Sequence, residues 1–105
     1  MAQFDVYRNR HAASREAIPY FLQLQHDQIQ TRALRVVAPL IPLSRVEVLM
    51  SRLNPVFDIE GRKLVLSTLE IAGISSSFLG DDIVMSLAER RDNIIAAVDF
   101  LVTGI

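Results

Sequence analysis

The 105-residue chain contains no cysteine, and this excludes disulfides, thiolate nucleophiles and cysteine metal sites together. It also contains no uninterrupted apolar run of the length that a membrane-spanning helix needs, so we expect no membrane partner. The opening residues, MAQFDVYRNR, become charged before an apolar run develops, so they do not resemble a signal peptide. These three absences together predict a cytoplasmic protein.

An excess of charge of one sign is also missing, because 11 basic residues oppose 12 acidic ones and the net charge is −1. We therefore expect no direct binding of nucleic acid through overall charge. Half of the residues are hydrophobic, so a single folded domain spanning residues 1–105 is predicted. The charge is unevenly divided: residues 1–52 carry seven arginines and four acids, which favours an acidic partner for this half.

Recognisable catalytic signatures are absent as well. No phosphate-binding glycine loop or zinc signature occurs, and the serines of residues 75–77 lack the context of a nucleophile elbow. His11 and His26 lie in polar loops without a partner at helical spacing, so no metal or cofactor is expected. The residues alone indicate an interaction module, not an enzyme. The conceivable parts of a ribonuclease site, for which no spacing argues, are Thr31, Arg32, Arg35 and Glu70.

The first two thirds of the chain show strand patterns. Residues 3–7 and 18–24 alternate between two faces, and residues 35–41 form a β-branched run typical of a doubly buried strand. We expect Pro39 and Pro42 to close this third strand. Residues 56–59 and 62–68 flank Glu60 and Gly61, a pair that predicts a hairpin turn. About five antiparallel strands follow from these patterns.

The final twenty residues predict an amphipathic helix over residues 87–102. Ser86 and Glu89 have the spacing of a capping box, and Gly104 follows the last helical residue. Phe100 falls on the polar side beside Ala96, where it would contact something other than the core. The expected core-facing stripe consists of Leu87, Ile94, Ile95, Val98, Leu101 and Val102.

The segments between the predicted strands and the helix show weaker hydrophobic periodicity. Residues 8–16 predict a mobile basic loop, either merely solvated or able to bind acids or phosphate. Residues 26–33 form a polar connection, and residues 43–53 fit a short amphipathic helix and an irregular hairpin equally well. Gly73 and residues 75–77 predict a bend, after which Gly80 and Asp81 lead into the closing helix. Strands followed by one terminal helix indicate an α+β, mostly β fold of small-barrel type.

Four segments in collinear order resemble the CcdB family, the toxins of bacterial toxin–antitoxin modules. They are the opening MAQFDVYRN, the run VVAPL, the pattern LxPxxxIxGRKLVL over residues 53–66 and the ending RxxIxxAVDFLxxGI. The similarity covers residues 3–105. It implies an SH3-like barrel with a C-terminal helix, a homodimer, and a fold shared with the RNA-cleaving toxins MazF and Kid.

The same resemblance implies binding to the A subunit of DNA gyrase through the end of the chain. The implied gyrase-binding residues are Gln28, Ile29, Asp99, Val102, Thr103, Gly104 and Ile105. Thr103 and Val102 stand where the best-known members carry tryptophan and phenylalanine, and Asp99 and Gln28 replace asparagine and isoleucine. Since an aromatic anchor typically contributes about 2 kcal/mol or more to an interface, we expect weaker gyrase inhibition than in those members.

The resemblance further implies a CcdA-like antitoxin with a disordered acidic segment. We expect it to bind the arginines of the first half, Arg8, Arg10, Arg15, Arg45 and Arg52. The expected dimer interface contains Ala96, Phe100 and Thr103. The function predicted is that of a type II toxin that binds gyrase and is neutralised by its antitoxin. The alternatives are a MazF-like endoribonuclease and a homologue that has lost toxicity and only binds antitoxin.

Overall fold

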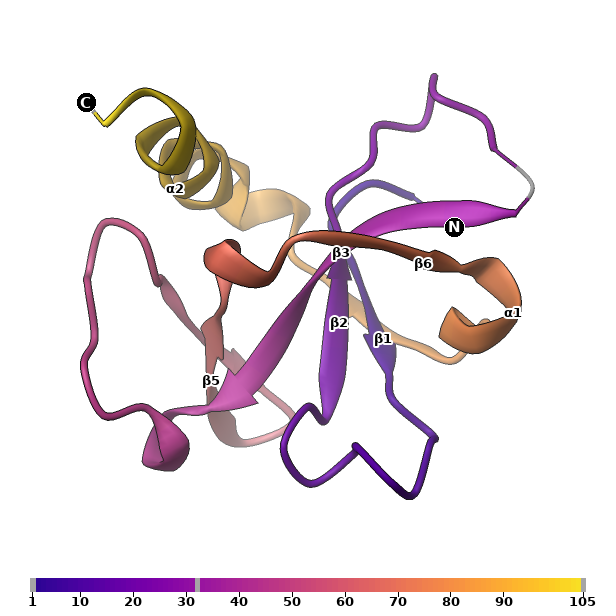
Figure 1. The fold of residues 1–105 in the computed structure, drawn as a ribbon, viewed down its shortest axis with the longest axis horizontal. Helices are drawn as coiled ribbons and strands as arrows, with labels where there is room; N and C mark the ends of the chain where they lie inside the picture. Colours follow the sequence, from indigo (N-terminus) through magenta and orange to yellow (C-terminus); the bar gives the residue numbers. More distant parts are fainter. Residues whose placement is uncertain (1, 32, 105) are drawn as a thin grey trace.

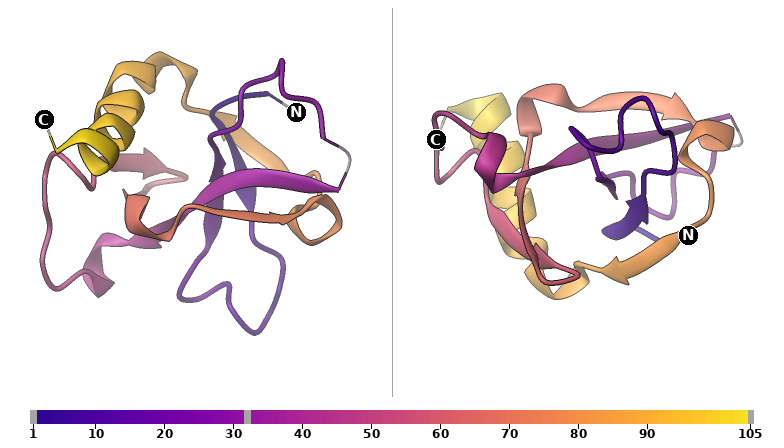
Figure 2. Two further views of the ribbon diagram at one scale, coloured as in Figure 1. Left: turned by 45° about the horizontal axis from the view of Figure 1, so that its top comes forward. Right: turned by 90° about the horizontal axis from the view of Figure 1, so that it is seen from below.

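The protein is described here by a computed structural model that covers residues 2–31 and 33–104. Seven antiparallel strands form one sheet in the order β4-β5-β3-β2-β1-β7, and β6 pairs with β3 off this path. The sheet curls around its core, and the longer helix α2 packs across one side (Figures 1 and 2). The strands are β1 Asp5–Arg8, β2 Tyr20–Gln23, β3 Leu34–Pro42, β4 Val56–Ile59, β5 Arg62–Leu66, β6 Ala72–Ser75 and β7 Ile83–Ser86. The helices are η1 Leu43–Arg45, η2 Thr68–Glu70, α1 Ser76–Leu79, η3 Ala88–Arg90 and α2 Arg91–Thr103.

The longest strand, β3, is the axis of the sheet. It pairs with β2 along one edge, while its other edge pairs with β5 near Leu40 and with β6 near Leu34. The prediction that Pro39 closes this strand is wrong, because Pro39 lies inside it and faces Phe21 of β2. The carbonyl of Pro39 accepts the Ser67 N–H at 3.0 Å, on the edge where the partner changes from β5 to β6. The missing N–H of proline faces the same edge, so no ladder bond is lost there.

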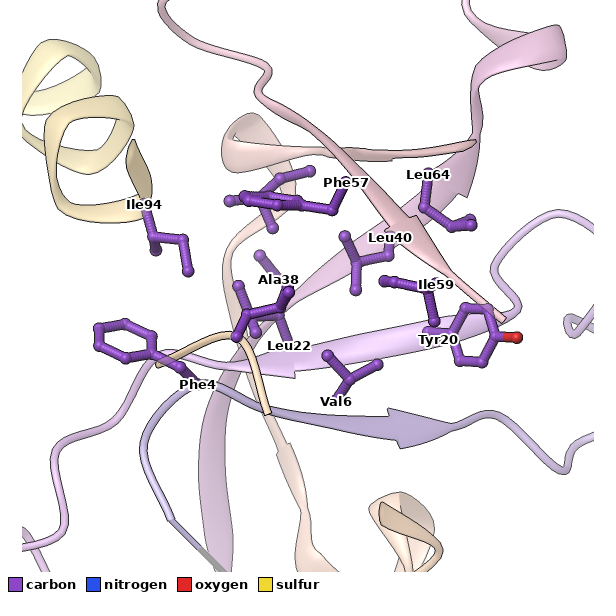
Figure 3. Packing of buried hydrophobic residues seen from close by; sticks show 12 residues of the cluster. Phe4, Val6, Tyr20, Leu22, Ala38, Leu40, Phe57, Ile59, Leu64 and Ile94 are labelled. Carbon is purple, nitrogen blue, oxygen red and sulfur yellow. The ribbon is translucent and has the colours of Figure 1, made fainter. Parts of the chain in front are cut away.

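The main core lies inside the curl of the sheet. Ile94 of α2 covers it from one side, and the rings of Phe4 and Phe57 lie near Ile94 (Figure 3). A second cluster on the outer face joins Tyr7, Phe21, Val37 and Leu79. Alternate residues of β1 and β2 therefore face opposite sides of the sheet, as predicted, and both sides are buried. The core cluster consists of Phe4, Val6, Tyr20, Leu22, Ala38, Leu40, Phe57, Ile59, Leu64, Leu66, Leu87 and Ile94.

The hairpin between β4 and β5 confirms the predicted turn. Glu60 and Gly61 both have positive φ, 51° and 77°, as the central residues of a type I′ turn require. Leu64 and Leu66 face the main core, as the alternation predicts.

Two strands escaped the sequence analysis. Gly73 lies within β6, not at a bend, and Ser75 caps the one-turn helix α1 by accepting the Phe78 N–H at 3.1 Å. Gly80, with a φ of 73°, turns the chain into β7 and not into the closing helix. Fold class nevertheless agrees with the prediction: an α+β, mostly antiparallel β domain of curled, barrel-like form with a C-terminal helix.

The closing helix starts later than predicted. Ser86 belongs to β7 and accepts the Ala88 N–H at 3.1 Å, and no side chain caps α2 at its first turn, so the predicted capping box does not form. Gly104 ends the helix in the left-handed conformation, as predicted. Ile94 faces the core, but Val102 is 76% exposed, because the last turn of α2 extends past the sheet.

Residues 43–53 adopt neither predicted structure. After η1 they form an irregular loop that leaves Val48, Leu49 and Met50 exposed. Residues 9–18 form an ordered loop in which the side-chain amide of Asn9 donates to Ser14 Oγ at 2.9 Å and to the Ile18 carbonyl at 2.8 Å. Within the described residues, no helix has the length and apolar character needed to cross a membrane.

Candidate functional site

Five arginines line a groove of about 570 Å³ at the end of the sheet opposite α2 (lower edge of Figure 1). The groove lies among the loop after β1, the beginning of β2, η1 and the first residue of β5. These segments are far apart in sequence, and the curl of the sheet brings them together. The lining residues are Arg8, Asn9, Arg10, Arg15, Glu16, Pro19, Tyr20, Pro42, Ser44, Arg45 and Arg62.

Two of these arginines are committed to an internal ion-pair cluster. The guanidinium of Arg8 donates to both carboxylate oxygens of Glu60 at 2.9 and 2.8 Å, and its Nε donates to Asp82 at 3.1 Å. Arg10 forms an ion pair with Asp82, and the Tyr20 hydroxyl donates to Glu60. This cluster fastens the tip of the β4–β5 hairpin, and the residue before β7, to the end of β1.

The cluster also shifts the pKa values of Glu60, Arg8 and Tyr20. The Arg8 bonds, and then the Tyr20 bond, lower the pKa of Glu60, so the carboxylate stays ionised. The same contact with Glu60 raises the pKa of Arg8. Burial, followed by the bond to Glu60, raises the pKa of Tyr20, which therefore remains a hydroxyl donor.

The other three arginines of the groove have no bonded acidic partner among the described residues, although Arg62 interacts electrostatically with Glu60. Of the residues that the structure describes, none forms an ion pair or a side-chain hydrogen bond with Arg15, Arg45 or Arg62. All three side chains are exposed. The groove thus has an excess of positive charge that suits carboxylate or phosphate groups, which arginine binds by charge-assisted hydrogen bonds.

Four of the five arginines predicted to bind antitoxin meet in this groove, but Arg52 does not. Its guanidinium lies over the Phe100 ring, 4.3 Å from the centroid, and so joins the loop after η1 to the last turns of α2. Arg62 was missed by sequence reasoning. The predicted hairpin could have pointed to Arg62, because a residue directly after a type I′ turn lies at the tip of the hairpin.

The predicted gyrase-binding residues form two exposed groups. Asp99, Val102, Thr103 and Gly104 lie at the C-terminal end of α2, where the Thr103 hydroxyl donates to the Asp99 carbonyl at 2.7 Å. Ile105 lies outside the described residues. The second group, Gln28 and Ile29, lies in the β2–β3 loop. Both groups are on the upper edge of Figure 1 but at opposite corners, so one protomer does not bring them together.

The predicted dimer residues lie on the side of α2 that faces residues 51–55. Ala96 is exposed and lines a recess of about 330 Å³ with Ser51, Arg52 and Pro55. Phe100 is half-buried, since the Arg52 side chain of the same protomer covers part of its ring. Thr103 is exposed one turn beyond Phe100. Phe100 therefore has a partner within its own chain.

The residues considered for ribonuclease chemistry do not converge. Arg35 donates to the carbonyls of Thr31 and Leu34, so its guanidinium is used in holding the β2–β3 loop. Within the described residues, no side-chain hydrogen bond or ion pair joins Glu70 to this pair, and Arg32 lies outside them. Over the described ranges no group of three potential metal ligands occurs.

Comparison with known protein families gives a match over nearly the whole chain. The sequence model of a protein family, described as CcdB protein, matches residues 3–104. Among curated proteins, no match was found.

Proposed function

This chain belongs to the CcdB family of toxin–antitoxin toxins, since the family match spans residues 3–104, and from this we propose that it binds and inhibits DNA gyrase. We further propose that a CcdA-like antitoxin neutralises it. We propose that the toxin acts by binding, and the residues considered for ribonuclease chemistry do not converge as far as the structure describes them. The observation that supports the gyrase proposal best is the exposed, apolar end of α2.

The end of α2 has the properties of a protein-binding projection. Val102 is 76% exposed although its neighbours on the apolar stripe are covered, so α2 presents an apolar side chain to solvent. Gly104 adopts a φ of 72°, which a side chain would disfavour, and it allows a partner to approach the backbone closely. The exposed Ile29 of the β2–β3 loop gives a second apolar contact on the same edge of the molecule.

A supercoiling assay with purified gyrase tests this proposal. Deleting residues 103–105 should abolish inhibition and leave the fold of the protomer intact, because these residues follow the packed part of α2. Thr103→Trp should inhibit more strongly, by about tenfold or more, since a buried tryptophan anchor contributes about 2 kcal/mol.

A matched pair of valines is the control. Val102 and Val48 are both 76% exposed, but Val48 lies in the loop after η1 and not on α2. Val102→Ser should weaken inhibition and Val48→Ser should not. Full inhibition by the truncated chain would contradict the proposal. If Thr103→Trp inhibits gyrase and the wild type does not, the chain is a homologue that retains antitoxin binding alone.

The arginine groove is the proposed antitoxin site. Its positive charge complements a disordered acidic peptide, which would order on binding. Arg8 and Arg10 are already neutralised by Glu60 and Asp82, so Arg15, Arg45 and Arg62 carry the charge available to a partner. Arg52, which lies beside α2 and outside the groove, would bind a separate segment of the same peptide. A hollow of about 420 Å³, formed by Pro42, Leu43 and the stem of Lys63, adjoins the groove and accommodates apolar side chains.

We also propose that the protein is a homodimer that uses α2. The small side chain of Ala96 allows another helix to approach closely, and Phe100 and Thr103 lie one and two turns further along the same helix. In a symmetric dimer each protomer contributes both of the proposed gyrase-binding groups, so the assembly carries two copies of each group.

A further inference from the structure

Gln25, at the base of the β2–β3 loop, has a buried amide whose nitrogen and oxygen both form hydrogen bonds. The residue is 9% exposed. Its Nε2 donates to the Ile29 carbonyl and, at 3.2 Å, to Thr31 Oγ1. Its Oε1 accepts the Val36 N–H at 3.1 Å. The Gln25 side chain therefore connects two positions of the β2–β3 loop to strand β3, which follows the loop.

These contacts require glutamine. Both amide protons and the amide oxygen have partners, so a carboxylate of the same shape would lose the two donations to the loop. Asparagine is one methylene shorter and does not reach the same three partners. Buried polar groups that lose partners are costly, and the Ile29 carbonyl would have no other partner among the described residues.

Gln25 is in turn anchored to the core through Gln23. The Nε2 of Gln23 donates to the Gln25 carbonyl at 3.0 Å, and its Oε1 accepts the Tyr7 hydroxyl at 3.0 Å. Tyr7 is completely buried in the outer core cluster. Burial, followed by the charge of Asp5, raises the pKa of Tyr7, so its hydroxyl keeps the proton that it donates. The chain Tyr7–Gln23–Gln25 connects the packed sheet to the loop.

We propose that Gln25 is a positioning residue for gyrase binding, which holds the β2–β3 loop so that Ile29 projects from it. The role rests on the proposed function. Ile29 is 60% exposed while its backbone is tied on both sides, by Gln25 at the carbonyl and by the His26 carbonyl at its N–H, 3.0 Å away. The fixed backbone reduces the ordering that the loop must undergo on binding.

The test compares Gln25→Glu with Gln30→Glu. Both variants add one negative charge to the same loop, but Gln30 is exposed and has no side-chain hydrogen bond among the described residues. Gln25→Glu should weaken inhibition of gyrase supercoiling about tenfold, the effect of losing two modest hydrogen bonds. It should also speed amide hydrogen exchange across residues 26–31. Gln30→Glu should change neither, and both variants should bind an acidic antitoxin peptide at the distant arginine groove as the wild type does.

Three results would overturn this role. One is equal gyrase inhibition by Gln25→Glu and the wild type. Another is equal weakening by Gln30→Glu, which would make charge the cause. The third is a parallel loss of antitoxin binding, which would indicate a general structural effect. If Gln25→Glu does not fold, Thr31→Val removes one of the two acceptors of the Gln25 amide, together with the bonds of Thr31 Oγ1 to Leu34 and Arg35. It should shift inhibition and exchange in the same direction. A failure of the proposed function is distinct, because the wild type itself would then leave gyrase active.

Discussion

Glu60 shows how one residue can serve a local turn and the closure of the sheet at once. Its positive φ completes the hairpin turn, and its carboxylate receives Arg8 from β1 and Tyr20 from β2. The hairpin tip is thus held to strands that lie far away in sequence. A residue chosen only for its turn conformation would leave Arg8 to pair with Asp82 alone.

The pH dependence of the free energy of unfolding should reveal the contribution of the Glu60 carboxylate. The pKa of Glu60 is lowered in the folded state, first by Arg8 and then by Tyr20, so folding favours its ionised form. Its contribution is therefore present above the unfolded pKa of about 4.3 and is lost as the pH falls through the lower folded value. We expect Glu60→Gln to reduce the free energy of unfolding at neutral pH, and this difference from the wild type to shrink as the solution is acidified.

Urea unfolding measured between neutral and acidic pH checks this expectation. Asp58→Asn is the matched control, because Asp58 lies on the same hairpin and pairs only with the exposed Lys63 at 2.8 Å. It should have little effect at any pH, as exposed pairs usually do. A loss in Glu60→Gln that is the same at every pH would mean that the carboxylate charge is not responsible.

Three elements together form one basic surface: the loop that follows β1, the helix η1 and the first residue of β5. We expect Arg15→Gln, Arg45→Gln and Arg62→Gln each to lower the affinity for an acidic antitoxin peptide about two- to fivefold, as exposed charge pairs contribute ~0.2–1 kcal/mol. Arg8→Gln should mainly lower stability, because Arg8 is already bonded to Glu60 and Asp82.

Calorimetric titration at low and high salt measures these effects. Binding by the wild type should weaken with salt, and less steeply in each variant that has lost a free arginine. Arg91→Gln is the control, since this exposed arginine lies at the beginning of α2 and does not line the groove. An affinity that is independent of salt would contradict the electrostatic proposal.

The elements differ in how far their sequences determine them. The β4–β5 hairpin was predictable because Glu60 and Gly61 suit a two-residue turn and local residues decide it. Strand β6 was not, because its residues Ala72 to Ser75 include a glycine and show no clear alternation, and its pairing with β3 supplies the order. Ser86 carried a helix-capping signal, but pairing with Asp5 placed it in β7.

In the candidate site, too, local features were predictable from the sequence and tertiary contacts were not. Basic residues were recognisable in the sequence, but their grouping depends on the curl of the sheet. Arg8 meets Glu60 and Asp82 only through long-range pairing, and so the division between committed and free arginines was not predictable. The contact between Arg52 and Phe100 is likewise tertiary. By contrast, the position where α2 ends was predicted from Gly104, although Val102 was assigned to the core.

For the whole molecule, the proposed dimer makes Phe100 the decisive position. Phe100→Asp should convert the dimer to monomer in sedimentation experiments, because a charge would be placed in an apolar contact. The same change removes the ring on which Arg52 lies. Arg52→Gln separates the two effects, since it abolishes the stack within one protomer and keeps the aromatic ring. It should remain dimeric. A dimer that survives Phe100→Asp would contradict the assignment of this face.

The pairing of β1 with β7 sets an order of events for a newly made chain. Asp5 emerges from the ribosome about eighty residues before its partner Ser86. Until then one edge of β1 has no neighbour, and α2, which begins only five residues after β7, has no finished sheet on which to pack. Such long-range topologies also fold slowly, typically in milliseconds to seconds. The polypeptide therefore cannot present the proposed gyrase-binding end in its packed form before β7 and α2 have been synthesised, and translation itself delays the proposed inhibition until then.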